Sequence, residues 1–347
     1  METDAIRVQR WTEGAGFDLL QLPRSVAGGM PLVEVDLALV CGSDGHTVSG
    51  RRRSPSPSIL GHESVGRVVS AERRMLDVLG EPVRVGDRIV WSVTSTCGRC
   101  DRCRRGLTAK CRSVLKTGHE LLVGPWALSG GYATHIALHP GLALVRVPES
   151  VGDAEAAMSA CALATVMACV EAAGPLDGRR VLVLGVGMLG VCAVAVARRW
   201  GAAEVVAVDP APDRLDLARS AGADTAVAPS DLMGEFDVII ELSGATSSVN
   251  AAFAHAALGG TIVLAGSVTP GPDVAIDPEQ VTRSWWTIRG VHNYEPRHLQ
   301  AAIDFLAEAP LGLRGIFADP VPLADLPRLF DAAPEPGVLR RSVRPRR

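Results

Sequence analysis

The sequence lacks the features that mark several large classes of protein. Its 35 Lys and Arg residues nearly balance 38 Asp and Glu, so it has no cationic excess of the kind that a nucleic-acid-binding surface needs. No apolar run approaches the roughly 18 to 20 residues that cross a bilayer, and the first ten residues lack the profile of a signal peptide. We therefore expect a cytoplasmic protein with no nucleic-acid or membrane partner.

Internal repeats, collagen-like periodicity and the composition of a disordered chain are also missing. The hydrophobic content of 47% over 347 residues is that of a globular protein, and a domain usually spans roughly 100–200 residues. Two domains are therefore expected. The dense basic clusters, residues 51–53 and the tail after Leu339, are interpreted as solvated segments.

Two kinds of sequence meet near residue 152. Before it, residues 31–40 alternate apolar and polar side chains, and glycine and proline recur at short intervals, which predicts a β-rich domain. After it, a long Ala-rich helix leads into alternating strands and helices, which include a helix over residues 249–260 and a strand over 261–267. Apolar strands alternating with helices predict an α/β, doubly wound parallel sheet with both faces covered.

A glycine-rich turn follows the first strand of this series. Residues 185–190 read GVGMLG, open a predicted helix, and precede Asp209 at the end of the next strand. The first two glycines permit a tight turn and backbone approach to a pyrophosphate, and Asp209 is expected to bond the adenosine ribose. A carboxylate there favours NAD over NADP, although Arg214 lies near enough to leave NADP open. The predicted cofactor residues are Gly185, Gly187, Met188, Leu189, Gly190, Asp209 and Arg214.

Four cysteines occur within one short segment. Cys97, Cys100, Cys103 and Cys111 have the spacing C-x2-C-x2-C-x7-C, which brings four thiolates together in one loop. Four sulfur ligands close the tetrahedron of Zn2+ and leave no position for a substrate. This segment is therefore predicted to bind a structural zinc ion.

A second set of metal-ligand side chains is dispersed along the chain. Cys41 and His62 lie on short turns after apolar strands, and Cys161 offers a third ligand. Two Cys and one His leave the fourth position of Zn2+ open, as a catalytic site requires. Glu63 is an outer carboxylate or occasional ligand in this interpretation, and Asp44 can orient the His62 ring. Cys169 and Cys192 lie in predicted helices and are assigned to the core.

Taken together, these motifs resemble those of the zinc-containing medium-chain alcohol dehydrogenases, over nearly the whole chain. The resemblance rests on CGSDGH at residues 41–46, GHESVGRV at 61–68, the four-cysteine segment, Cys161 with Thr165 downstream, GVGMLG and Asp209. It implies a Rossmann domain, residues 164–291, inserted in a GroES-like, zinc-binding catalytic domain formed by residues 1–163 and 292–347. It also implies a homodimer or homotetramer.

The resemblance also implies roles for single residues. Cys41, His62 and Cys161 would hold the catalytic zinc, although some members of the family place a carboxylate at the third position, and Glu155 lies six residues upstream of Cys161. Ser43 and His46 would relay the proton by way of the nicotinamide ribose. The remaining implied cofactor contacts are Thr165 and, toward the phosphates, Arg340, with Arg341 as an equally placed neighbour.

The implied reaction is reversible hydride transfer between an alcohol and NAD, giving an aldehyde or ketone. Several details, among them KTGHE at residues 116–120, resemble alcohol dehydrogenases associated with phosphonate metabolism. That subgroup suggests an anionic substrate, with Arg51, Arg52, Lys116, His119, Arg289 or His292 as contacts. The alternatives are a polyol or amino-alcohol dehydrogenase, a zinc-free reductase of the same fold, and a non-catalytic cofactor-binding relative.

Overall fold

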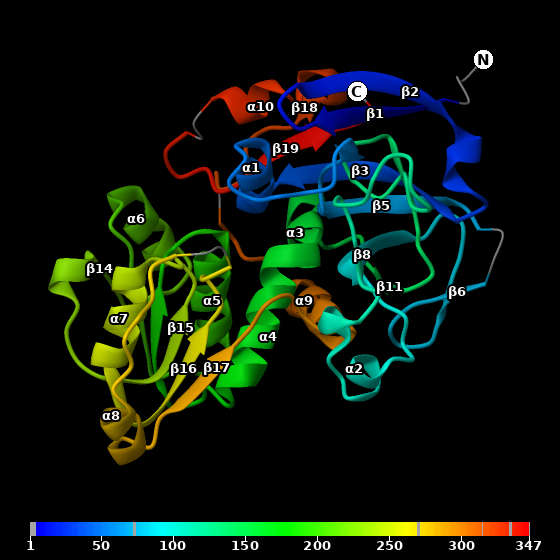
Figure 1. Ribbon diagram of the computed structural model, residues 1–347. Helices are drawn as coiled ribbons and strands as arrows, with labels where there is room; N and C mark the ends of the chain where they lie inside the picture. Colours follow the sequence, from blue (N-terminus) through cyan, green and yellow to red (C-terminus); the bar gives the residue numbers. More distant parts are fainter. Residues whose placement is uncertain (1–4, 72–73, 269–270, 314, 333–334, 347) are drawn as a thin grey trace. The chain divides into compact units, whose positions relative to one another are not determined.

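The computed structural model describes residues 5–71, 74–268, 271–313, 315–332 and 335–346. The chain divides into two compact units. The first comprises Met1–Ala164, Glu295–Pro310 and Ile316–Arg347, and the second comprises Thr165–Tyr294 and Leu311–Gly315. Each unit is described by itself below, with element labels as in Figure 1.

The first unit is built mainly on antiparallel strands, with β18 and β19 as a parallel pair (Figure 1). Its larger sheet has eight strands in the described chain, with the order β11-β8-β5-β3-β19-β18, while β10 pairs with β3 and β9 with β8. A smaller sheet has the order β2-β1-β4, and β6 pairs with β7. The strands are β1 Ala5–Thr12, β2 Gly16–Pro23, β3 Leu32–Val40, β4 Ser58–Ile59, β5 Glu63–Ser70, β6 Met75–Leu76, β7 Pro82–Val83, β8 Arg88–Ser95, β9 Leu115–Lys116, β10 His135–Ala137, β11 Leu142–Arg146, β18 Val321–Pro322 and β19 Arg341–Arg344.

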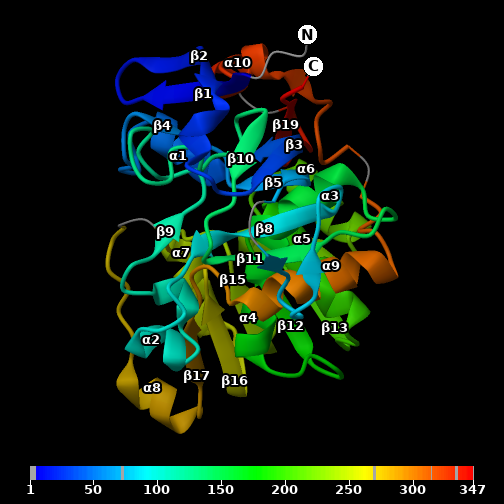
Figure 2. The ribbon, with the colours of Figure 1, turned by 90° about the vertical axis from the view of Figure 1, so that its right-hand side faces the viewer.

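The C-terminal segment returns to this unit, since Val343 of β19 pairs with Ala38 of β3. Both views place α10 beside the β1–β2 hairpin, where the rings of Phe17 and Phe330 stack at 4.9 Å between centroids (Figures 1 and 2). The fully buried core includes Trp91, Trp126, Tyr132 and Ile136. The helices of this unit are η1 Arg24–Ala27, α1 Gly42–Val48, α2 Asp101–Arg104, η2 Thr108–Lys110, α3 Asp153–Met158, η3 Ser159–Leu163, α9 Pro296–Glu308, η5 Leu323–Asp325 and α10 Arg328–Asp331.

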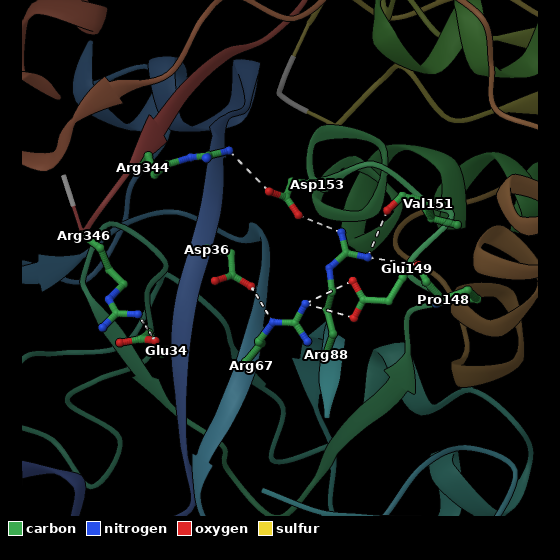
Figure 3. A network of polar contacts seen from close by, with 10 residues as sticks. All are labelled: Glu34, Asp36, Arg67, Arg88, Pro148, Glu149, Val151, Asp153, Arg344 and Arg346. Atoms are coloured by element: carbon green, nitrogen blue, oxygen red, sulfur yellow. Dashed lines mark hydrogen bonds and ion pairs between the residues drawn. The ribbon is translucent and has the colours of Figure 1, made fainter. Parts of the chain in front are cut away.

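An ion-pair network fixes the start of α3 against the large sheet (Figure 3). Arg88 of β8 is 6% exposed and donates to Asp153 at 2.7 Å and to the Val151 carbonyl at 2.9 Å. Arg344 of β19 lies 3.3 Å from the same carboxylate. Because buried guanidinium groups need several acceptors, this network holds α3 in one place and thereby positions the residues that follow it, including Cys161.

The helix that contains Cys161 corrects one expectation from the sequence. Asp153–Ala173 is long and apolar enough to cross a membrane, whereas no such run was expected, but 78% of its apolar window is buried inside the protein. This is the composition of a core helix as well as of a membrane span. Cys161 lies in a π-helical stretch, Ser159–Leu163, between α3 and α4. Such stretches are frequent at functional sites because they redirect side chains.

The second unit is a six-stranded parallel sheet with the order β14-β13-β12-β15-β16-β17. The order reverses between β12 and β15, so the crossover helices on either side of this point lie on opposite faces, as expected for a doubly wound fold. The strands are β12 Arg180–Leu184, β13 Glu204–Val208, β14 Thr225–Val227, β15 Phe236–Glu241, β16 Ala256–Leu264 and β17 Thr287–Gly290. The helices are α4 Ala164–Ala173, α5 Met188–Arg199, α6 Pro212–Ser220, η4 Pro229–Asp231, α7 Thr246–Ala254 and α8 Pro278–Arg283.

The helix predicted for residues 249–260 was too long. Helix α7 ends at Ala254, and residues 256–260 form the first part of β16. Alanine and leucine favour a helix locally, but Gly259 has φ +73° and pairing with β15 supplies an alternative set of backbone hydrogen bonds. Tertiary pairing therefore outweighs local propensity here.

Candidate metal and cofactor sites

Four potential metal ligands from three parts of the chain meet in the first unit. Ligand atoms of Cys41, His62, Glu63 and Cys161 all lie within 4.8 Å of one another. The antiparallel pairing of β3 with β5, in register at Leu39 and Glu63, brings the turn that carries Cys41 beside His62. The π-helical stretch supplies Cys161. Glu155 is not part of this group, so the grouping favours Cys161, and its role as the third ligand stays a prediction.

The His62 ring is oriented by a buried carboxylate. Asp44 Oδ1 lies 3.3 Å from His62 Nδ1, and Asp44 is itself held by the Cys41 amide at 3.1 Å and the Tyr132 hydroxyl at 2.8 Å. Burial lowers the pKa of His62, but Asp44 and Cys41 outweigh burial and hold this pKa well above its ordinary value. Because Asp44 engages Nδ1, the opposite nitrogen, Nε2, is left to bind a metal.

Glu63 is paired with an arginine that arrives from the other end of the chain. Arg340 donates to both carboxylate oxygens, at 2.7 and 3.0 Å, and its Nη2 lies 3.6 Å from Cys41 Sγ. Burial raises the pKa of Glu63 to about 7, against the opposing effect of Arg340. The sequence indicated Arg340 only as a cofactor contact and missed this pair. The available signal was Glu63 itself, because a glutamate that becomes buried needs a cationic partner.

The surroundings of Cys41 favour its thiolate form, which is the form that binds a metal ion. A hydrogen bond from Cys161 lowers the pKa of Cys41 well below its ordinary value, against the effect of burial and with help from Arg340. Both cysteines are free, and Cys41 is buried. A thiolate, a second thiol and an oriented imidazole form a donor set that suits Zn2+ and leaves one position open. The residues present therefore fit a catalytic zinc ion.

The other predicted zinc segment also comes together. The sulfur atom of Cys100 lies 3.5 Å from that of Cys103 and 4.0 Å from that of Cys111. The sulfur atoms of Cys97 and Cys111 are 3.5 Å apart. Sulfur atoms at about 2.3 Å from a tetrahedral Zn2+ would lie about 3.8 Å apart. Backbone amides of Cys97 and Cys100 donate to sulfur at 3.4 Å. This arrangement fits a closed, structural zinc site.

The segment with the four cysteines is tied to helix α9. Glu295, the N-cap of α9, accepts hydrogen bonds from the backbone amides of Thr108 at 3.0 Å and Ala109 at 3.2 Å, and from the Thr108 hydroxyl. These bonds link the loop just before Cys111 to an element nearly two hundred residues later in the chain. The zinc segment therefore braces the first unit rather than projecting from it.

The glycine-rich turn of the second unit has the geometry of a dinucleotide site. Gly185 has φ +90°, and a Cβ atom there would lie 2.8 Å from Ser243. A Cβ at Gly187 would meet nothing within 4 Å, so the backbone at the start of α5 is open to a ligand. An open helix N-terminus attracts phosphate. Asp209 lies beside the turn and accepts from the Val186 amide at 2.8 Å, while Arg214 reaches the Val186 carbonyl at 3.4 Å.

Two residues of the expected proton relay lie on α1, next to the zinc ligands. Ser43 Oγ is 3.5 Å from His62 Nε2, and His46 follows three residues later in the same helix. Burial lowers the pKa of His46, and Arg51 lowers it further. A neutral imidazole that is partly exposed can accept a proton and return it to solvent.

A second Gly-His pair packs against Gly61 and His62. A Cβ at Gly118 would lie 2.7 Å from the Gly61 carbonyl, and this close approach places the ring of His119 5.8 Å from that of His62. His119 bonds Ser54 at 3.1 Å. Burial lowers its pKa to about 3, with further lowering by His62 and Arg52. The sequence named His119 only as an anion contact and gave no sign of this proximity.

The remaining expected contacts lie in two places. Arg51, Arg52 and Lys116 belong to the first unit, with the zinc ligands, whereas Arg289 and His292 belong to the second. Thr165 is the first residue of the second unit. Their contacts with a substrate or cofactor stay predictions, as does the contact of Arg340 with cofactor phosphates.

Two family models match the chain. Residues 28–149 match the alcohol dehydrogenase GroES-like domain, and residues 188–308 match the zinc-binding dehydrogenase model. The matches cover the segment from before Cys41 through the four cysteines, and the segment from Met188 into α9.

Relatives of known activity match over most of their length. The chain is 32% identical to a 5-exo-hydroxycamphor dehydrogenase of Pseudomonas putida over 324 residues, which cover 86% of this chain and 84% of the relative. It is 30% identical to an L-threonine 3-dehydrogenase of Shewanella sp. strain W3-18-1, with 91% and 93% covered. An alcohol dehydrogenase structure from Thermotoga maritima superposes with a TM-score of 0.89 at 26% identity, covering 98% and 99% of the two chains.

Proposed function

The chain belongs to the family of zinc-containing medium-chain alcohol dehydrogenases, and from this premise we propose that it oxidises a small anionic alcohol with NAD as the hydride acceptor. Family membership makes it a zinc- and NAD(P)-dependent dehydrogenase. We assign both zinc ions to the first unit and the dinucleotide to the second. The preference for NAD, the anionic group and the phosphonate connection are the proposed refinements.

Three cationic side chains of the first unit, Arg51, Arg52 and Lys116, support the proposal of an anionic substrate. Arg52 and Lys116 both act on the buried imidazole of His119, and Arg51 and Arg52 act on His46. Burial lowers the pKa of Lys116, and the positive charge of Arg52 lowers it further. Clustered positive charge beside a partly desolvated site raises the local concentration of an anion and can bind it through charge-assisted hydrogen bonds.

The chain's own residues supply positioning and proton transfer. When bound, Zn2+ supplies Lewis acidity at its open position and NAD supplies the hydride acceptor. Asp44 holds the His62 ring in the orientation that a metal ligand needs. Ser43, beside His62 Nε2, would relay the proton of the alcohol by accepting it as its own hydroxyl proton is donated onward, and the partly exposed His46 would exchange a proton with solvent.

The first test concerns the cofactor. Asp209→Ser removes the carboxylate that would bond the ribose diol and repel a 2′-phosphate. We expect the ratio of kcat/KM for NAD to that for NADP to fall by about tenfold to a hundredfold, as a like-charge penalty of a few kcal/mol is removed. Initial rates with each cofactor measure this ratio. A wild-type protein that uses NADP more efficiently would show that our interpretation of Asp209 is wrong.

The second test concerns the substrate. With 2-hydroxyethylphosphonate beside 1-propanol, we expect the anionic alcohol to be the better substrate. Arg51→Ala and Lys116→Ala, tested singly, should each lower its kcat/KM about tenfold to a hundredfold if the cation bonds the anion. Turnover of propanol should change little. Arg283→Ala, which removes an exposed arginine of α8, is the matched control. Equal turnover of both alcohols, unaffected by these changes, would remove the phosphonate proposal and leave the dehydrogenase standing.

The named relatives point to amino alcohols as an alternative substrate class, and polyols are tested beside them. One of them is named an L-threonine 3-dehydrogenase, and L-threonine is an amino alcohol that also carries a carboxylate. An amino-alcohol or polyol substrate therefore belongs in the same assay panel, as L-threonine and L-idonate. Preference for either over 2-hydroxyethylphosphonate would replace the phosphonate with that class.

We also propose a cytoplasmic homodimer or homotetramer. None of the eight cysteines, all of which the structure describes, forms a disulfide, and six of them lie in the two candidate zinc-ligand groups, as expected in a reducing compartment. At the edge of the parallel sheet, β17 is exposed, and Trp285 beside it is 81% exposed. An open strand edge with a large apolar neighbour is suited to pairing with a second copy.

A further inference from the structure

A buried carboxylate, that of Glu241, lies at the carboxyl edge of the parallel sheet and has no role in the proposed metal and cofactor sites. Glu241 is the last residue of β15 and is 0% exposed. It pairs in register with Leu184, the last residue of β12. The strand order reverses between these two strands, so Glu241 borders the crevice in which open α/β sheets bind dinucleotides.

The carboxylate of Glu241 organises the turn that follows β15. Its Oε1 accepts hydrogen bonds from the Ser243 amide at 2.8 Å, the Ser243 hydroxyl at 2.6 Å and the Gly244 amide at 2.8 Å. The other oxygen, Oε2, is buried and has no hydrogen-bond partner among the described residues. An ionised carboxylate is costly to bury, so three donors on one oxygen indicate that this turn is strongly held.

The same turn packs against two neighbouring turns at this edge. A Cβ at Gly185, in the glycine-rich turn, would lie 2.8 Å from the Ser243 Cβ. A Cβ at Gly266, after β16, would lie 2.2 Å from the Gly244 amide nitrogen. The backbone carbonyl of Glu241 also accepts from the Gly266 amide at 3.0 Å. The Ser243 turn is therefore closely packed between the glycine-rich turn and the turn after β16.

The position of this turn relates it to one half of the cofactor. Asp209 follows β13, on one side of β12, and is expected to receive the adenosine ribose. Glu241 ends β15, on the other side of β12. A dinucleotide that crosses the switch point therefore extends its nicotinamide half over the turn after β15. We propose that Glu241 is a positioning residue, which holds the Ser243–Gly244 turn in place to receive the nicotinamide half of the dinucleotide.

The inference rests on the proposed function, because it requires that the chain binds NAD. Glu241→Gln keeps the shape of the side chain and an acceptor oxygen, but it removes the negative charge and so weakens the three charge-assisted hydrogen bonds to Oε1. We expect the Kd for NADH, measured by fluorescence, to rise about tenfold, which corresponds to ~1.4 kcal/mol. The Kd for AMP, measured by calorimetry, should stay unchanged because AMP occupies only the adenosine half.

Two further variants complete the experiment. Glu204→Gln removes a half-exposed carboxylate at the opposite end of the sheet, where β13 begins, and should leave both Kd values unchanged. Ser243→Ala removes one of the three hydrogen bonds to Glu241, together with the bond that the Ser243 hydroxyl accepts from the Ala245 amide at 3.1 Å. It should raise the Kd for NADH about threefold, so it tests the inference even if the Gln variant does not fold.

The outcomes separate the inference from the function on which it rests. Weaker binding of NADH with unchanged binding of AMP supports the positioning role. Equal loss of both ligands shows a general structural role, and unchanged binding of both shows no role, so either result overturns the inference. A wild-type protein that binds AMP but not NADH would refute the proposed cofactor itself.

Discussion

Replacing His62 by alanine is expected to abolish turnover while the protein remains folded and binds the cofactor. In the proposed site, His62 is one of three ligands of the catalytic zinc ion, and the Asp44 carboxylate lies 3.3 Å from its ring. A zinc ion contributes several kcal/mol of charge stabilisation at the reacting oxygen, and about 4 kcal/mol corresponds to roughly a thousandfold in rate. We therefore expect kcat to fall by at least about a thousandfold, measured as NADH formation.

Metal content and cofactor binding complete this test. The wild-type protein should contain two zinc ions per chain, the variant one, and NADH should bind both equally well. His135→Ala is the matched control, because His135 is a buried imidazole of β10 that belongs to none of the metal-ligand groups of the described residues. Finding a single zinc ion in fully loaded wild-type protein would contradict the two-site interpretation.

Replacing Cys100 by serine is expected to harm folding rather than the chemical step. The four cysteines are predicted to close the coordination of a zinc ion, and Glu295 ties the same segment to α9. Structural zinc sites contribute directly to folding free energy, and losing one is among the most damaging single changes. We expect the free energy of unfolding to fall by about 4 kcal/mol or more, which lowers Tm by roughly 10 °C for a domain of this size.

The control for this change is a cysteine outside both zinc groups. Cys169 is fully buried in α4, so Cys169→Ser should retain two zinc ions. The kcat of Cys100→Ser is measured at low temperature, where part of the variant remains folded. Divided by the content of catalytic zinc, this kcat should stay near the wild-type value. A variant with unchanged Tm and two zinc ions would show that this segment does not bind a structural metal.

Local sequence patterns predicted the parts of the sites that are close together in the chain. The glycine-rich turn and the four cysteines each occupy a short segment, so their spacing alone indicates what they can bind. Asp44 is likewise near Cys41, and its role toward His62 was anticipated. Such inferences hold because a short loop has few ways to arrange its side chains.

Long-range pairs could not be predicted in this way. Glu63 meets Arg340 across 277 residues, and His119 lies beside His62 only because two glycines allow their loops to approach. Cys161 lies beside Cys41 and His62 in a π-helical stretch that the Ala-rich sequence does not reveal. Helix propensity also misplaced the end of α7, since pairing with β15 outweighed it.

The sequence by itself determined the kinds of site that this protein contains. Metal-ligand types, their spacing and the order of strands and helices are local properties, and they were sufficient to indicate two zinc sites and a dinucleotide fold. The tertiary structure alone decided which groups complete those sites, including Arg340 against Glu63 and Glu241 at the switch point. The physical reason is that a buried charge depends on partners that only the folded chain brings within hydrogen-bond distance.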